Sequence, residues 1–326
     1  MITKIQFPDG YEYRRAAFYL AAEEYVATRY EAGSYLFTWQ LRPTVVMGRN
    51  QVAHQEVDID FCRHHHIDII RRKSGGGAIF ADEGNIMVSL ITEGGAVEPI
   101  FERYAHSVAA VLRELGAPAI VSGRNDILLE EGGKVCGNAF YHLRNRNIVH
   151  GTMLYDTASH LMEGALHPDV SKLEAKGVKS VRRRVSLLKD YLPFGVSELR
   201  RRVEDGLSTS SLMLTAADIE AIEAIEATYY DEQYLYGSSA KSDVTLGGRI
   251  EGCGELLLHF SLRGSIIHEV TLSGDFFELS DAHQAFSSCF CGATFTPAAM
   301  TEAIRQSHPE SSIRGLSEQT LADMLA

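Results

Sequence analysis

The sequence predicts an α/β (α+β) fold, in which a mixed sheet is flanked by helices and followed by a small β-β-α-α unit. The chain has 326 residues, which is more than one hydrophobic core usually supports, so two domains are expected. Strand-like runs dominate the centre with helical stretches between them, a pattern typical of a mixed sheet. A polar, turn-rich stretch at Gly237–Asp243 then precedes the last part. We therefore expect one domain over 1–240 and an accessory domain over 245–326.

The elements of the first domain follow from periodicity and from helix and turn signals. An amphipathic helix is expected at Tyr11–Tyr30, with an apolar stripe on one side and charged residues opposite. A second helix is expected at Pro99–Leu115, because proline lies near its start and Gly116 follows its end. Strands are expected at Tyr35–Gln40, Thr44–Met47, Asp68–Arg72, Ile86–Ile91, Ile127–Leu129, Lys134–Tyr141 and Asn147–Tyr155.

The second domain is expected to begin with a hairpin. A helix at Thr215–Tyr230 precedes the linker, and two alternating runs then flank Arg263-Gly264. The expected strands are Glu255–Leu262 and Ile266–Ser273, and the expected helices are Pro297–Ser307 and Ser317–Leu325.

Composition excludes several classes of function. The formal net charge of −12 argues against a dedicated nucleic-acid binder. No apolar run approaches the length of a membrane span, and the first residues do not resemble a secretory signal. Five cysteines form an odd set without the spacing of a disulfide framework, so reduced thiols and a cytoplasmic location are expected. The triple histidine at His64–His66 is expected to be a helix end rather than a metal site.

The most informative stretch spans residues 69–85 and reads IIRRKSGGGAIFADEGN. Two arginines and a lysine leave a strand and lead through Ser74 into Gly75-Gly76-Gly77. Consecutive glycines let a ligand approach the main chain, successive N–H groups can bind an anion, and guanidinium groups add phosphate contacts. The loop therefore suggests a nucleotide site, although a glycine-rich loop alone is more often a solvated connection.

A second motif follows about fifty residues later. Gly123-Arg124-Asn125-Asp126 precedes a predicted hairpin, and its second arm begins at Lys134. Asp126 is a candidate ligand for Mg²⁺, which prefers carboxylates together with phosphate oxygens. Lys134 follows a Gly-Gly turn, so its ammonium group is positioned to swing beside a phosphate. A strand-terminal lysine by itself is usually only solvated.

Together these segments resemble the lipoate–protein ligases. The matching motifs, in chain order, are TVVMGRNQ (44–51), RRKSGGGAIFADEGN (71–85), GRNDILL (123–129), GKVCGNAF (133–140), IVHGTMLYD (148–156), LHPDVSKLEAKGVKSVRRRVSLL (166–188) and GDFF (274–277). Their order matches as well as their content, and two of them also resemble segments of the biotin–protein ligases. The resemblance implies a biotin/lipoate protein ligase-like catalytic domain with a C-terminal accessory domain.

The resemblance implies a two-step reaction that uses ATP and Mg²⁺. Lipoate is activated to lipoyl-adenylate and is then transferred to a lysine of a lipoyl domain, as in E2 subunits or the glycine-cleavage H protein. The implied nucleotide-binding residues are Arg72, Gly77, Ala78, Ile79, Phe80 and Lys134. The implied lipoate-binding residues are Lys134, Ser74, Gly75, Gly76 and His150, although a sheet-core role for His150 is equally compatible with the sequence. Lys134 is the expected catalytic residue, and Asp126 is the expected Mg²⁺ ligand.

Three departures from the family pattern keep alternatives open. Ala81 stands where the family usually has histidine, Cys136 where serine is common, and Arg183 and Leu187 vary a later segment. A reactive Cys136 would instead favour an octanoyltransferase of the same fold, which needs no ATP. Loss of turnover would leave a non-catalytic lipoyl-domain-binding protein. The basic run Arg182–Arg184 is the candidate surface for the acceptor domain.

Overall fold

The computed structural model describes residues 1–325 except 12, 31, 123–125, 167–184 and 238–241. The chain divides into two compact units. The first consists of Met1–Met47, His54–Arg71 and Ala78–Asp231, and the second of Gly48–Ala53, Arg72–Gly77 and Glu232–Ala326. Two short segments from the N-terminal half thus belong with the C-terminal residues. The domain limits expected from the sequence, 1–240 and 245–326, stay a prediction.

The first unit is built on a large mixed sheet. Within the described residues, eight strands pair in the order β11-β1-β2-β6-β10-β9-β8-β7. Their bounds are β1 (Ile2–Gln6), β2 (Ser34–Trp39), β6 (Asn85–Glu93), β7 (Ala119–Ser122), β8 (Asp126–Leu129), β9 (Lys134–Leu143), β10 (Arg146–Leu154) and β11 (Ser210–Met213). β1 is parallel to β2 and β11. Every other pair of neighbouring strands, from β2 along the sheet to β7, is antiparallel. The predicted α/β class with a mixed sheet is confirmed.

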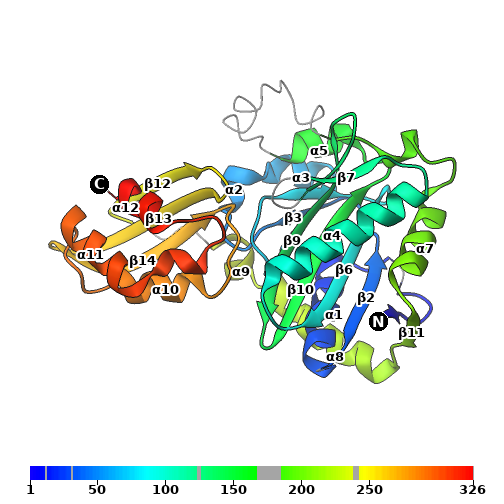
Figure 1. Ribbon diagram of the computed structural model, residues 1–326, viewed down its shortest axis with the longest axis horizontal. Coiled ribbons are helices and arrows are strands. Elements are labelled where there is room, and N and C mark those ends of the chain that lie inside the picture. The colour runs from blue at the N-terminus through cyan, green and yellow to red at the C-terminus, as the bar shows by residue number, and fades with distance from the viewer. Residues whose placement is uncertain (12, 31, 123–125, 167–184, 238–241, 326) are drawn as a thin grey trace. The chain divides into compact units, whose positions relative to one another are not determined.

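Helices cover both faces of this sheet (Figure 1). Their bounds are α1 (Ala16–Arg29), α4 (Val97–Glu114), α7 (Val196–Leu207) and α8 (Ala216–Glu226). The ring of Trp39 on β2 stacks on Tyr19 of α1, with ring centroids 5.0 Å apart. The preceding residue, Thr38, accepts a hydrogen bond from Arg200 of α7 at 2.7 Å. Because successive residues of a strand point to opposite faces, α1 and α7 lie on different sides of the sheet.

Helix α1 differs from its prediction in length and in exposure. It begins at Ala16 rather than Tyr11, and its charged side is not solvated: Glu23 is 0% exposed and Glu24 is 8% exposed. Helix α8 packs on α1, and Tyr229 of the short helix η3 (Ala227–Tyr230) donates a hydrogen bond to Glu24. Because other elements cover both sides of α1, its glutamates are buried even though the amphipathic pattern predicts that they face solvent.

A smaller sheet of the first unit flanks the glycine-rich stretch. It has the order β4-β3-β5, with bounds β3 (Thr44–Met47), β4 (Asp68–Arg71) and β5 (Ile79–Ala81). β3 and β4 were predicted, and β5 was not, because three residues are too short for a periodic signal. The remaining elements of this unit are α2 (Ala53–Glu56), α3 (Ile59–His64), α5 (Ser159–Ala165) and η2 (Leu188–Asp190). The histidine run ends α3, as expected.

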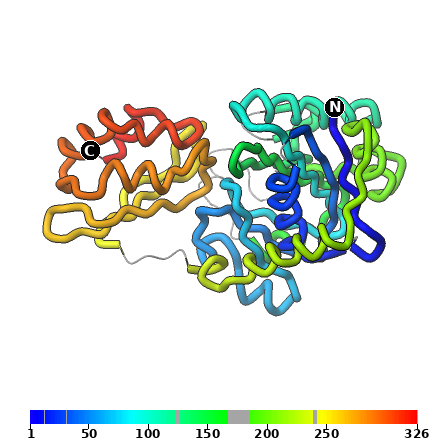
Figure 2. The backbone as a smooth tube through the Cα atoms, turned by 90° about the horizontal axis from the view of Figure 1, so that it is seen from below, coloured from blue at the N-terminus to red at the C-terminus, as the bar shows by residue number. Residues whose placement is uncertain are grey.

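The C-terminal part of the second unit is a three-stranded antiparallel sheet with helices on one face (Figure 2). Its elements are α9 (Glu232–Tyr236), β12 (Val244–Ile250), β13 (Gly254–Arg263), β14 (Ile266–Gly274), α10 (Ala282–Phe290), α11 (Pro297–Ser307), η4 (Pro309–Ser312) and α12 (Glu318–Met324). Leu256, Leu258 and Phe260 alternate along β13 into a core shared with Phe286 and Phe290 of α10.

Compared with the predicted β-β-α-α order, this part has one more strand, β12, and one more α-helix after the hairpin, α10, besides the short helix η4. β12 was missed because it carries Gly247-Gly248 and alternates between half-buried and exposed residues, so it lacks a strong apolar signal. The hairpin and the two later helices were predicted within a few residues. None of the helices in the described residues is both long and apolar enough to cross a membrane.

Candidate active site

Arg72 shapes the glycine-rich loop from inside. Its guanidinium group is 5% exposed and donates hydrogen bonds to Ser74 Oγ at 2.9 Å and to the carbonyl oxygens of Gly75 and Gly77, both at 2.8 Å. A planar cation with several donors can hold a bend in this way without leaving carbonyl groups unpaired. In this structure Arg72 therefore organises the loop that the sequence assigned to the nucleotide.

The same loop packs against backbone of its own unit. The N–H of Gly76 donates to the carbonyl oxygen of Phe276 at 3.2 Å, and Gly76 has a φ of +86°. A Cβ atom on Gly75 would come within 2.3 Å of the Phe276 oxygen, and one on Gly48 within 1.9 Å of the Gly76 oxygen. These glycines are required because main chains approach too closely for any side chain.

Gly77 behaves differently from its two neighbours. A Cβ atom there would meet nothing within 4 Å, so this side of the loop is open. Ile79 and Phe80 follow in β5, where Phe80 is buried and pairs with Val45 of β3. An open glycine at the end of an anchored loop is a suitable place for close approach of a phosphate group.

In the first unit, Lys134 and Asp126 form an ion pair at the starts of two neighbouring strands. Nζ of Lys134 lies 2.8 Å from Oδ1 of Asp126, and the side chains are 31% and 28% exposed. The strand register places Asp126 opposite Gly137, not opposite Lys134. The lysine reaches the carboxylate by folding back over Gly137, where a Cβ atom would lie 2.6 Å from both Cε and Nζ. Gly137 is thus needed for the position of the ammonium group.

This ammonium group shares a sheet face with a buried polar network. Gly137 pairs with Thr152, and Ala139 pairs with His150, so all four positions lie on one face of the sheet. Nδ1 of His150 lies 2.9 Å from Oε1 of Glu23 on α1. Because a carboxylate only accepts hydrogen bonds, the proton on this imidazole is assigned to Nδ1.

The network continues across the sheet. Ser89 of β6 donates to Oε1 of Glu23 at 2.6 Å and accepts from Nε1 of Trp39 at 2.9 Å. Glu23, Ser89 and Trp39 are each at most 1% exposed, and His150 is 6% exposed. Every member holds its neighbour in place, so the imidazole is fixed beneath α1 rather than mobile.

Comparison with known proteins agrees with these motifs. The family model of the lipoyl protein ligase A/B catalytic domain matches residues 15–208, and that of the bacterial lipoate protein ligase C-terminus matches residues 239–325. The chain belongs to the lipoate–protein ligase family. The predicted ligase class is therefore confirmed.

Three individual proteins illustrate the family likeness. Lipoate–protein ligase 1 of Staphylococcus aureus is 31% identical over 83% of this chain and 85% of its own length. The lipoate-protein ligase LplJ of Bacillus subtilis is 31% identical over 81% of this chain and 83% of its own length. The crystal structure of LipL1 of P. falciparum in complex with lipoate has a TM-score of 0.79 at 15% identity, covering 99% of this chain and 97% of that one. That structural likeness supports the fold.

For a ligase of this family, Cys136 is in the wrong state to act as a nucleophile. It is 2% exposed, and burial raises the pKa of its thiol to about 12, although Lys134 partly opposes the shift. The thiol is therefore protonated at neutral pH, whereas a reactive cysteine needs the thiolate. Cys136 is a packed side chain of β9.

The structure gathers most of the predicted residues into two groups. Arg72, Ser74 and the three glycines form the loop of the second unit, whereas Lys134, Asp126 and His150 lie in the first unit. Ala81, where the family usually has histidine, is completely buried in β5. The basic run Arg182–Arg184 lies outside the described residues. Sequence reasoning missed Glu23, because a glutamate on an amphipathic helix normally faces solvent; its only signal was its neighbour, a second glutamate in an otherwise apolar run.

Proposed function

We propose that the chain activates lipoate with ATP to lipoyl-adenylate and then transfers the lipoyl group to a lysine of a lipoyl domain. One observation carries the proposal: the Lys134 ammonium group is held over Gly137, on the sheet face that leads to the buried Glu23–His150 pair. A cation at one end, and beyond it a strand that carries only the small residues Gly137 and Ala139 on this face, match an acid with a long slender arm. Membership of the family, and relatives that are named lipoate–protein ligases, support the same assignment.

Lipoate would bind with its carboxylate on Lys134. Its pentanoyl arm would run over Gly137 and Ala139, two residues that span about 7 Å of strand and carry little side chain. His150, opposite Ala139, would then lie beside the far end of the arm. Ser74, Gly75 and Gly76 shape the loop in this structure, so their proposed role toward lipoate is to hold that loop rather than to line the arm.

Activation would begin when the lipoate carboxylate attacks the α-phosphorus of ATP. A carboxyl oxygen–phosphorus bond forms, the bond to the β-phosphate oxygen breaks, and pyrophosphate leaves. The main barrier is repulsion between two anions, which fixed positive charge offsets. The ammonium group of Lys134 would leave Asp126 and pair with the two reacting anions, the lipoate carboxylate and the α-phosphate. The loop at Gly77, with Ala78–Phe80, would hold the phosphates while Arg72 maintains the bend.

Asp126 fits the role of a Mg²⁺ ligand. Its Oδ1 atom is buried and, apart from the ion pair with Lys134, has no hydrogen-bond partner among the described residues. An under-satisfied carboxylate is the ligand type that Mg²⁺ takes in nucleotide sites. When bound, the ion would neutralise phosphate charge; the carboxylate itself serves to hold Lys134 until substrate arrives.

Transfer would need no protein nucleophile. The neutral ε-amine of the acceptor lysine attacks the carbonyl carbon of the mixed anhydride, AMP leaves with the electron pair of the broken bond, and the nitrogen proton passes to solvent. Positioning of the amine supplies most of the acceleration. We propose lipoyl domains of E2 subunits and the glycine-cleavage H protein as acceptors, Arg182–Arg184 as their docking run, and the cytoplasm as the location.

The test is incubation of the full chain with ATP, Mg²⁺, lipoate and a lipoyl domain, followed by intact-mass measurement of the acceptor. The expected result is a mass increase of one lipoyl group, together with lipoate-dependent exchange of pyrophosphate into ATP. An octanoyltransferase would show acyl transfer from acyl carrier protein and no exchange. A non-catalytic binder would form no AMP, and either outcome would overturn the proposal.

A further inference from the structure

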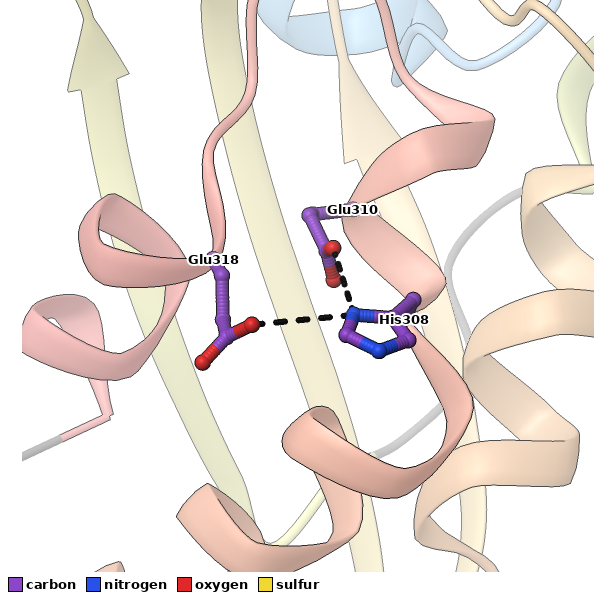
Figure 3. Close-up of side chains that lie close together, drawn as sticks. All are labelled: His308, Glu310 and Glu318. Atoms are coloured by element: carbon purple, nitrogen blue, oxygen red, sulfur yellow. Dashed lines mark hydrogen bonds and ion pairs between the residues drawn. The ribbon is translucent and has the colours of Figure 1, made fainter.

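Three side chains meet at the C-terminal end of helix α11, far along the chain from the residues proposed for the ligase reaction (Figure 3). His308 directly follows α11, Glu310 lies in η4, and Glu318 is the first residue of α12. One potential ligand atom from each lies within 4.8 Å of the others. The three residues therefore join three separate elements at one point.

The distances between these atoms also suit a shared cation, although His308 and Glu310 form a long hydrogen bond in this structure. Nδ1 of His308 lies 3.3 Å from Oε1 of Glu310 and 3.6 Å from Oε2 of Glu318. Both separations exceed the usual N–H···O distance. Two ligand atoms of a tetrahedral zinc ion, each about 2.1 Å from the metal, are about 3.4 Å apart. The observed separations bracket this value.

Glu310 supplies an independent observation. The residue is only 9% exposed, yet its Oε2 atom is buried without a hydrogen-bond partner among the described residues. Figure 3 shows its carboxylate turned toward the imidazole of His308. A buried carboxylate oxygen with no donor is costly, and a bound cation removes the cost.

The local charge also favours a divalent cation. Two carboxylates face the imidazole of His308, and Arg305 contacts Glu318 through the other carboxylate oxygen, Oε1, at 3.9 Å. Arg305 thus orients Glu318 and leaves Oε2 directed at His308. The two carboxylates bring more negative charge to this point than the one arginine offsets.

We propose that His308, Glu310 and Glu318 bind one zinc ion, with water as the fourth ligand. An imidazole nitrogen with two carboxylate oxygens is a ligand set that zinc accepts, and the side chain of His308 is 58% exposed, which leaves room for water. The ion ties the end of α11 to the start of α12. Because metal binding to a folded site adds directly to folding stability, the zinc ion would stabilise the small C-terminal sheet and its helices.

The test uses the full chain, freed of metal with a chelator, in buffer without Mg²⁺. Titration with Co²⁺ should give the visible absorption of a tetrahedral site, and an equivalent of Zn²⁺ should abolish it. Zn²⁺ should also raise the melting temperature. Absence of both signals overturns the proposal. Near-ultraviolet thiolate-to-cobalt absorption at one equivalent would instead place the ion on a cysteine and would equally overturn it.

Two variants locate the ion. Glu310→Gln keeps the shape of the side chain, and His308→Asn suits the left-handed backbone at φ 49°. Each should weaken Co²⁺ binding at least tenfold. The matched controls His268→Asn and Glu269→Gln alter an exposed His–Glu pair on β14 and should leave binding unchanged. If either cluster variant binds Co²⁺ as tightly as the parent while circular dichroism shows it folded, the assignment fails. Glu318→Gln, at the rim, provides the same test should either variant unfold.

Discussion

The first unit contains two hydrogen-bonded polar pairs on one sheet that differ in how firmly they are held. Glu23 and His150 are buried, with side chains 0% and 7% exposed, and Ser89 and Trp39 hold the glutamate. Lys134 and Asp126 are about one-third exposed, and the bond between them spans a glycine. The buried pair cannot exchange partners without unfolding its surroundings. The partly exposed pair of Lys134 and Asp126 can exchange partners. A reaction in which charge changes requires such an exchange.

Replacement of Lys134 by alanine tests the exchangeable pair and should have the largest effect. Removing a preorganised cation from the reacting anions should slow lipoate-dependent pyrophosphate exchange by roughly 10²–10³-fold. Stability should change by less than about 1 kcal/mol, because the pair is partly exposed. The measurements are exchange kinetics and urea unfolding. Lys189→Ala is the matched control, since Lys189 makes a similar ion pair with Asp156 at the surface. Equal slowing in both variants would contradict the role of Lys134.

Replacement of Glu23 by leucine tests the fixed pair. It leaves His150 and Ser89 without their shared acceptor, and breaking a buried pair from one side typically costs about 3 kcal/mol. Urea unfolding should show this loss, with a smaller one for Glu23→Gln, whose amide oxygen still accepts. Glu102→Leu changes an exposed glutamate on α4 and serves as the reference. A loss no greater than that of the reference would mean that the pair is not a structural unit.

Asp126→Asn separates the two roles proposed for this carboxylate. Loss of a charge-assisted interaction of about 1.5 kcal/mol should raise the Mg²⁺ concentration needed for half-maximal exchange by roughly tenfold. Stability should hardly change, because a partly exposed ion pair contributes little. The measurement is a Mg²⁺ titration at fixed ATP and lipoate. An unaltered Mg²⁺ requirement would leave Asp126 only as the partner of Lys134.

Cys136→Ala should have the smallest effect. The pKa of this thiol is raised to about 12 by burial, so it stays protonated throughout the neutral range. Ligase activity should remain within about twofold, apart from the modest cost of a smaller core side chain. Iodoacetamide at pH 8 should modify the exposed Cys291 in the native chain and spare Cys136. Complete loss of acyl transfer in a folded variant would reopen the cysteine mechanism.

The same raised pKa gives a pH dependence with a defined sign. Between the unfolded value near 9.0 and the folded value of about 12, the folded chain binds the thiol proton and the unfolded chain releases it. Stability should therefore fall as pH rises from about 9. Urea midpoints measured at pH 8 and pH 10 check this, and Cys136→Ala should show a smaller difference between the two.

The order of the sequence motifs was sufficient to predict the glycine-rich loop and the position of Lys134, because each motif consists of residues adjacent in sequence. The strands of the sheet were also predictable where a long, largely apolar run is continuously buried, as in β6 and β10. β1 and β11 were missed: both are short, carry polar residues and lie toward one end of the sheet, so their signal is weak.

Side-chain partners were harder to predict than elements. Glu23 is buried because it points from α1 onto the sheet, where Ser89 and His150 bind it, a tertiary effect that periodicity cannot report. Arg72 was expected to face phosphate, and the structure shows three of its hydrogen bonds directed into its own loop. Lys134 meets Asp126 only because Gly137 lacks a side chain, which the hairpin register alone does not reveal.

The hydrogen bond between Gly76 and the carbonyl oxygen of Phe276 has a consequence for biosynthesis. At a ribosomal rate of about 5–20 residues per second, the 200 positions between these residues take roughly 10–40 s to translate. Asn50 is likewise translated long before Gly274 and Glu278, with which it also forms hydrogen bonds. The glycine-rich loop thus leaves the ribosome well before the residues that complete its final form.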